Sequence, residues 1–251
     1  MTKITIEVCC ASVDDAVRAY EAGADRIEFN SALFAGGLTP SIGSVLEVRE
    51  RVPIPIICMI RPRPGGFYYT DLEFETMLRD AAELAKTGVE GFATGCLTQD
   101  GWLDAERNAR LVEAAGGKEM VFHRAFDIMR DMPEEALPAL ARIGFKRILS
   151  SGREPKAIEG AEILKRCVQI GGIEILAGGG VRPHNVMEII QKTGCDQVHF
   201  TCHQLQDDTS GKHAPVSFGV VNPPPPGKFS IVDPEKLKDF IALIRGDSDQ
   251  I

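Results

Sequence analysis

The sequence predicts a single parallel (β/α)8 barrel of the TIM type, and three observations support this fold. Short β-rich runs alternate eight times with longer runs whose apolar residues recur every three or four positions, as in repeated βα units. Four similar segments, beginning at Gly23, Gly88, Gly144 and Gly194, each join a helix to an even-numbered strand. No GxGxxG motif follows the first strand, as a dinucleotide-binding open sheet would require. We therefore expect residues 1–251 to form one barrel domain without an internal linker.

The eight strands are expected in short buried runs that end in polar residues or glycine. They are Ile4–Val8, Arg26–Phe29, Ile56–Ile60, Gly91–Thr94, Met120–Phe122, Arg147–Leu149, Ile173–Ala177 and Gln197–Phe200. Each is followed by a helical pattern with one apolar stripe, and the last of these runs from Leu237 to Ile244.

A loop of about 30 residues separates the last strand from the last helix, which is long for a bare connection. It contains Pro223–Pro226, and Val216–Val221 and Phe229–Val232 are expected to form a small hairpin within it. We expect this loop to cover one rim of the barrel or to meet another subunit.

Composition narrows the classes of function. The chain has 251 residues with 36 acidic and 28 basic side chains, so its net charge of -8 disfavours nucleic acid as a partner. No stretch approaches the roughly 20 apolar residues of a membrane span, and the residues Met1 to Val8 alternate without the apolar core expected of a secretory leader. The seven cysteines include no CxxC pair and are expected to be reduced thiols. These features predict a cytoplasmic protein that contacts neither membrane nor nucleic acid.

Charged side chains follow several strands at the rim where barrel enzymes place their active sites. Glu7 and Cys9 share one face of the first strand, and Glu28 lies on the second strand. Carboxylates inside a barrel need a partner, so Arg61 and Arg124 are the expected counter-charges. One interpretation is a structural ion-pair layer formed by Glu7, Glu28 and Arg61.

The other interpretation is a pocket for a small anion. Arg61, Arg63 and Arg124 would face a carboxylate or phosphate, which Arg binds through two hydrogen bonds. Two late loops would add backbone N–H groups that cradle phosphate, although their glycines equally suit tight turns. The loop residues are Ser150, Ser151 and Gly152, and Gly178, Gly179 and Gly180.

Two histidines end strands at the same rim. His123 and His199 would exchange protons between a substrate and Glu7 or Glu28 if they are catalytic, and otherwise they are structural residues. Asp127 is expected to orient a loop or to cap a helix.

Thiols at the rim suggest a different chemistry, because soft thiolate ligands select Cu(I). Four lie at or just beyond strand ends: Cys9, Cys10, Cys96 and Cys202. Adjacent cysteines on an extended strand point to opposite faces, so Cys9 and Cys10 are not expected to share one metal.

Taken together, these motifs resemble the CutC family, named for copper homeostasis, over essentially the whole chain. The resemblance rests on Glu7-Val8-Cys9, the Gly23 to Glu28 segment, Gly36 to Ser41, Met59 to Arg63, Phe122 to Asp127, Ser150-Ser151-Gly152, Gly178-Gly179-Gly180 and His199. It implies a cytoplasmic TIM barrel, often a dimer or larger homo-oligomer, that handles copper without an organic cofactor. Cys9 corresponds to one copper cysteine proposed for animal relatives, and Asn30 stands where the second would be.

Two functions remain open. The first is copper homeostasis, with Cu(I) bound by Cys9 and a neighbouring rim thiol, namely Cys10, Cys96 or Cys202. The second is an enzyme acting on a small anionic or phosphorylated metabolite, which Arg61 and Arg124 would bind. In either case we expect a homo-oligomer, a dimer or a tetramer.

Overall fold

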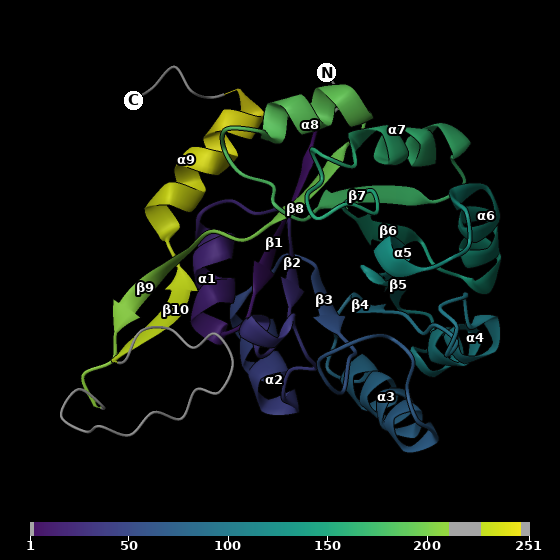
Figure 1. Cartoon of the computed structure of the whole chain (residues 1–251). Coiled ribbons are helices and arrows are strands. Elements are labelled where there is room, and N and C mark those ends of the chain that lie inside the picture. The colour runs from purple at the N-terminus through teal and green to yellow at the C-terminus, as the bar shows by residue number, and fades with distance from the viewer. Residues whose placement is uncertain (1–2, 211–226, 247–251) are drawn as a thin grey trace.

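A computed structural model describes residues 3–210 and 227–246, and within these ranges eight parallel strands close into a barrel (Figure 1). Each strand pairs with the next along the chain, and the eighth pairs with the first. The predicted (β/α)8 fold is therefore confirmed. The strands are β1 (Thr5–Cys10), β2 (Arg26–Phe29), β3 (Ile56–Met59), β4 (Gly91–Thr94), β5 (Glu119–Phe122), β6 (Arg147–Ser150), β7 (Glu174–Gly178) and β8 (Gln197–Phe200).

Helices surround this ring on its outside (Figure 1). They are α1 (Val13–Glu21), α2 (Ile42–Arg51), α3 (Asp71–Ala85), α4 (Ala105–Ala114), α5 (Ala125–Ile128), α6 (Pro133–Ile143), α7 (Ala161–Ile170), α8 (Val186–Thr193) and α9 (Pro234–Arg245), with a 3-10 turn, η1, at Leu33–Ala35. None of the helices in the described ranges is long and apolar enough to traverse a lipid bilayer.

Local sequence sets where these helices begin and end. The Ser12 hydroxyl accepts from the Asp15 N–H at the start of α1, and Thr70 and Glu73 form a capping box at the start of α3. Gly144 and Gly194 follow α6 and α8 in the left-handed conformation, with φ of 115° and 73°, which costs glycine little. These two of the four predicted helix-to-strand glycines thus end their helices for the expected reason, whereas α1 and α3 are capped by Ala22 and Lys86.

Two apolar layers hold the barrel together. A small inner layer fills the ring, and a larger outer layer packs between the strands and the helices. The inner layer consists of Ile57, Met59, Ala93, Val121, Leu149 and Leu176. Because these residues close the interior, the polar side chains at the carboxyl ends of the strands stand on an apolar floor.

Beyond the barrel, β9 (His203–Asp207) and β10 (Lys228–Val232) form an antiparallel ribbon (Figure 1). The predicted strand at Phe229–Val232 is present and pairs with His203–Asp207, whereas Val216–Val221 and Pro223–Pro226 lie outside the described residues. Asp15 and Arg18 of α1 hold the ribbon, because both bind the backbone of Val232.

Candidate functional site

A cavity of about 290 Å³ opens at the carboxyl ends of the strands, and we call it the barrel cavity. Six residues predicted from the sequence line it: Cys9, Glu28, Arg61, His123, Arg124 and His199. They come from β1, β2, the loops after β3 and β5, and β8. The rim thus brings together groups far apart in the sequence, as the barrel prediction required.

Glu7 lies buried beside this cavity in a charged network with Arg26 and His199. The Arg26 Nε donates to Glu7 Oε2, and His199 Nδ1 lies 2.8 Å from Glu7 Oε1. Burial raises the pKa of Glu7, but Arg26 and His199 outweigh it and hold this pKa at about 2. The prediction that Arg61 or Arg124 is the counter-charge of Glu7 was wrong, because Arg26 takes that role. Arg26 is its neighbour in the β1–β2 register.

Three potential metal ligands meet in the barrel cavity. Within the described residues, Cys9, Glu28 and His199 place their ligand atoms within 4.8 Å of one another. The Cys9 thiol donates to Glu28 Oε2 at 3.5 Å, and His199 Nε2 lies 3.9 Å from the same oxygen. Because Glu7 holds Nδ1 of His199, the Nε2 atom is directed at the cluster, an orientation typical of metal-binding histidines.

The other rim thiols do not reach this cluster. Cys10 and Cys96 are buried in the outer apolar layer, and Cys202 lies half-buried at a different cavity. The expectation of a second thiol ligand beside Cys9 was therefore wrong. Cys10 faces the opposite side of the sheet because it is consecutive with Cys9, and Cys96 and Cys202 follow other strands and pack elsewhere. Asn30 stands next to Cys9 instead, and its Nδ2 donates to the Cys9 sulfur at 3.4 Å and to Glu28 at 2.9 Å.

Burial also sets the protonation of the cluster. Desolvation, with Glu28 close by, raises the pKa of the Cys9 thiol well above its usual range. Burial likewise raises the pKa of Glu28. A metal ion entering here must therefore displace the thiol proton.

His123 lies on the far wall and is 2% exposed. Burial and the nearby Arg61 lower its pKa to about 3, so the imidazole is neutral around physiological pH. Its Nδ1 accepts from the Ala125 N–H at 3.3 Å, and its ring packs on Phe67 with centroids 4.5 Å apart. This environment does not suit the proton exchange near neutral pH predicted for His123, but it suits a fixed hydrogen-bond donor.

The three predicted anion-binding arginines have separate surroundings. Arg61 donates to the carbonyls of Ala35, Gly36, Gly37 and Gly65 from beneath the rim. Arg63 turns away from the barrel cavity to Glu73, 2.6 Å from its carboxylate, so its predicted role in the pocket was wrong. Arg124 reaches the cavity while pairing with Asp127.

One of the two loops of the predicted phosphate cradle, the loop after β6, is filled by the chain itself. The Asp127 carboxylate accepts from the Ser150 hydroxyl at 2.6 Å and from the N–H groups of Ser151 and Arg153 at 3.1 and 3.2 Å. This carboxylate takes the place that the sequence interpretation assigned to a phosphate. Asp127 therefore orients the loop, one of its two expected roles.

The glycines of the two loops serve close packing and tight turns. A Cβ on Gly152 would lie 2.1 Å from the Gly160 carbonyl oxygen. Gly179 and Gly180 have φ of 95° and 67°. Gly178 is the last residue of β7, where a Cβ would meet Leu149. The tight-turn alternative accounts for Gly179 and Gly180.

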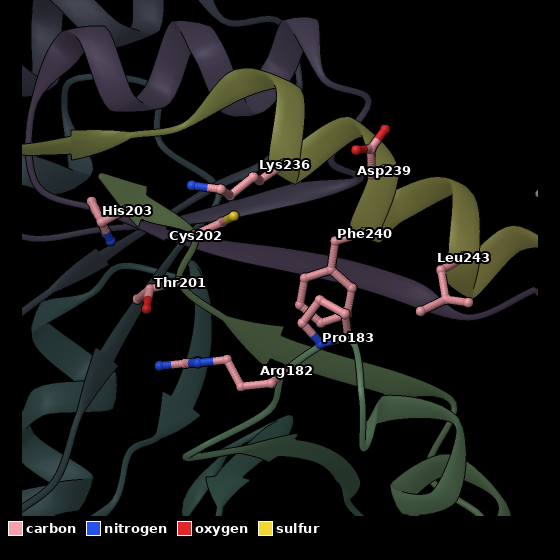
Figure 2. Close-up of a pocket in the computed structure, with 9 residues that line it drawn as sticks. All are labelled: Arg182, Pro183, Thr201, Cys202, His203, Lys236, Asp239, Phe240 and Leu243. Atoms are coloured by element: carbon pink, nitrogen blue, oxygen red, sulfur yellow. The ribbon is translucent and has the colours of Figure 1, made fainter. Parts of the chain in front are cut away.

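A second cavity, of about 610 Å³, lies between the end of β8, the loop before α8 and α9. Figure 2 shows Arg182 and Lys236 on opposite sides of it, with Cys202 between them. Lys236 pairs with Asp233 at 2.9 Å, and Arg182 donates to the Val181 carbonyl at 2.7 Å. Among the polar residues of this cavity the sequence singled out only Cys202, because the others come from separate loops, from β9 and from α9 without a shared motif.

Comparison with known proteins gives consistent results. The sequence model of the CutC family matches residues 4–204. The CutC family protein of Treponema denticola is 41% identical over 244 residues, covering 96% of this chain and 99% of its own length. The copper homeostasis protein cutC homolog of Homo sapiens is 40% identical over 80% of this chain and 74% of its own. A crystal structure of a CutC protein from Streptococcus agalactiae superposes with a TM-score of 0.74, at 34% identity, covering 78% of this chain and 97% of that one.

Proposed function

The chain belongs to the CutC family, and from this premise we propose that it serves copper homeostasis by binding one Cu(I) ion at Cys9 and His199. The observation that carries the proposal is the convergence of the Cys9, Glu28 and His199 ligand atoms within 4.8 Å. A thiolate and an imidazole are ligands that copper favours, whereas hard cations prefer oxygen.

Metal binding at the cluster releases protons. Cys9 is 5% exposed, so the charges at the cluster are stabilised away from water. Burial lowers the pKa of His199, but Glu28 and Glu7 outweigh it and raise this pKa, so an ion bound at Nε2 displaces an imidazolium proton as well as the thiol proton of Cys9. The preference for Cu(I) in our proposal therefore rests on the soft thiolate ligand.

Two neighbours fix the geometry of the proposed ligands. Glu7 holds the His199 ring through Nδ1, and Asn30 donates to the Cys9 sulfur. Hydrogen bonds to metal ligands of this kind set ring orientation and thiolate basicity. In our proposal, Asn30 acts on Cys9 from the position where the family resemblance implied a second cysteine.

The proposal includes a reducing compartment, the cytosol. All seven cysteines are free, and six of them are buried, which suits a protein that stays reduced.

The experiment is an anaerobic titration of the reduced protein with Cu(I) against a competing chelator. We expect one ion per chain, and we expect Cys9→Ser to weaken binding by at least ~100-fold, since it removes the sole thiolate of the cluster. Cys202→Ser is the matched control, because Cys202 lies at the second cavity, and it should bind as the wild type does. Equal Cu(I) affinity in Cys9→Ser, or preference for Zn²⁺ over Cu(I), would refute the proposal.

The second candidate function, an enzyme acting on a small anionic metabolite, keeps support from one observation. His123 carries a buried Nε2 that has no hydrogen-bond partner among the described residues, and it lines the barrel cavity. The phosphorylated form of this candidate loses the support of the loop after β6, because Asp127 binds the N–H groups of Ser151 and Arg153.

A further inference from the structure

Two buried hydrogen-bond donors on the wall after β3 and β5 have no partner within the described residues. They are Nε2 of His123 and Nε of Arg61, in residues that are 2% and 6% exposed. The Tyr69 hydroxyl is the polar side-chain group that lies beside Arg61, and it too lacks a partner within hydrogen-bond geometry. The Ala125 N–H donates to Nδ1 of His123, which leaves the ring proton on Nε2. His123 and Arg61 both line the barrel cavity, and we call their Nε2 and Nε groups the donor pair. Buried donors without acceptors are rare in folded proteins and need an explanation.

Arg61 also has no acidic partner among the described residues. Its two terminal nitrogens donate to four neutral backbone carbonyls, and its guanidinium lies 5.3 Å from the centre of the Phe67 ring. The acids around it are engaged elsewhere: Glu7 with Arg26, Glu73 with Arg63, and Asp127 with its loop. A buried cation without a counter-charge is unfavourable, so an anion bound at the donor pair would stabilise it.

The geometry of the barrel cavity selects the kind of anion. A carboxylate has two oxygens, one for each donor of the pair, and it carries a single negative charge. Glu28 lines the same cavity, and it repels a dianion more strongly than a monoanion. The volume of about 290 Å³ lies at the lower end for ligand cavities, and Met59, Leu149 and Phe67 give it apolar walls.

We propose that the donor pair binds the carboxylate of a small monocarboxylic acid, whose short carbon chain lies against Met59 and Leu149. This inference deepens the second candidate function by naming its ligand class. It does not require copper, because His123 and Arg61 are not members of the metal cluster.

The test uses copper-free, reduced full-length protein with butyrate as the probe and its neutral isostere butyramide as the control ligand. Binding is followed through the imidazole ¹⁵N signals of labelled histidine and by calorimetry. We expect saturable binding of butyrate, a shift of the His123 Nε2 signal, and butyramide at least ~10-fold weaker, as for loss of a charged hydrogen-bond acceptor. Inorganic phosphate should not compete.

Variants separate a binding role from a structural one. His123→Phe keeps an aromatic ring against Phe67 and should weaken butyrate ~10-fold while the protein stays folded. Arg61→Gln should abolish butyrate binding, and if that variant does not fold, His123→Phe alone decides. Arg63→Gln is the matched control and should bind butyrate as the wild type does, since Arg63 turns outward to Glu73.

No saturable binding of butyrate, phosphate binding as tightly as butyrate, or unchanged affinity in His123→Phe would each overturn the inference. Because copper is absent throughout, failure here leaves the Cu(I) proposal standing. Failure of the Cu(I) titration likewise leaves this result unaffected.

Discussion

His123 should make the stability of this protein fall as the pH falls below neutral. Its imidazole is buried, and desolvation together with Arg61 holds its pKa at about 3, against an ordinary value of 6.5. The unfolded chain therefore gains a proton at His123 below about pH 6.5, while the native state resists protonation until about pH 3. The contribution of the neutral His123 ring to the unfolding free energy is fully present above the unfolded-state pKa of 6.5, and it is lost as the pH falls from there to about 3.

Linkage gives the magnitude of this loss. At about pH 5 the loss of unfolding free energy from His123 alone is ~2 kcal/mol, and it approaches ~5 kcal/mol below about pH 3. Because other groups also titrate over this range, the informative quantity is the difference between the wild type and a variant without the imidazole.

The assay is equilibrium urea unfolding followed by circular dichroism at about pH 7 and about pH 5, for the wild type and for His123→Phe. The wild type should lose ~2 kcal/mol more than His123→Phe between these two conditions. His184→Gln removes an exposed imidazole as the matched control, and it should retain the wild-type loss. An identical loss in the wild type and in His123→Phe would show that the buried ring accepts a proton as readily as the unfolded one, and would refute the reasoning.

Three further predictions concern the residues around the rim. Glu7→Gln should lower the unfolding free energy by ~3 kcal/mol or more in urea unfolding at neutral pH, because it leaves the buried Arg26 without a carboxylate. A smaller loss would contradict the buried pairing of Arg26 with Glu7. Gly152→Ala should lower the unfolding free energy by well over ~2 kcal/mol in the same assay, since its Cβ would lie 2.1 Å from a carbonyl oxygen. Gly172→Ala is the control, at positive φ but with open space around it, and it should lower the unfolding free energy by only ~1–2 kcal/mol. Asp127→Ala should free the N–H groups of its loop, so that inorganic phosphate raises the Tm of this variant but not of the wild type, and no rise in the variant would refute the assigned role of that carboxylate.

The candidate site was partly predictable, because alternation along a strand is a local property. Glu7 and Cys9 are two residues apart on β1, and both point to the barrel interior, as the alternation required. The same rule separated Cys10 from Cys9. Alternation also places Arg26 and Glu28 on one face of β2, but it does not reveal that Arg26 pairs with Glu7. That pairing follows from the register between β1 and β2.

Beyond the end of a strand, alternation no longer predicts which way a side chain points. Arg61 and Arg63 are two residues apart, yet they lie in the loop after β3, and only Arg61 faces the barrel cavity. Asp127 follows β5 on a short helix, and its carboxylate meets the loop after β6. Loop conformation depends on long-range hydrogen bonds, and no periodicity in the sequence encodes them.

The sequence by itself determined the closed barrel and the rim where its polar residues gather, because apolar periodicity and helix-ending glycines are local signals. Only the tertiary structure decided which charges pair, which thiol faces the cavity, and that Asp127 fills one loop of the expected phosphate cradle. These outcomes depend on which segments the closed ring places side by side, and the contacts that fix them join residues distant in the chain.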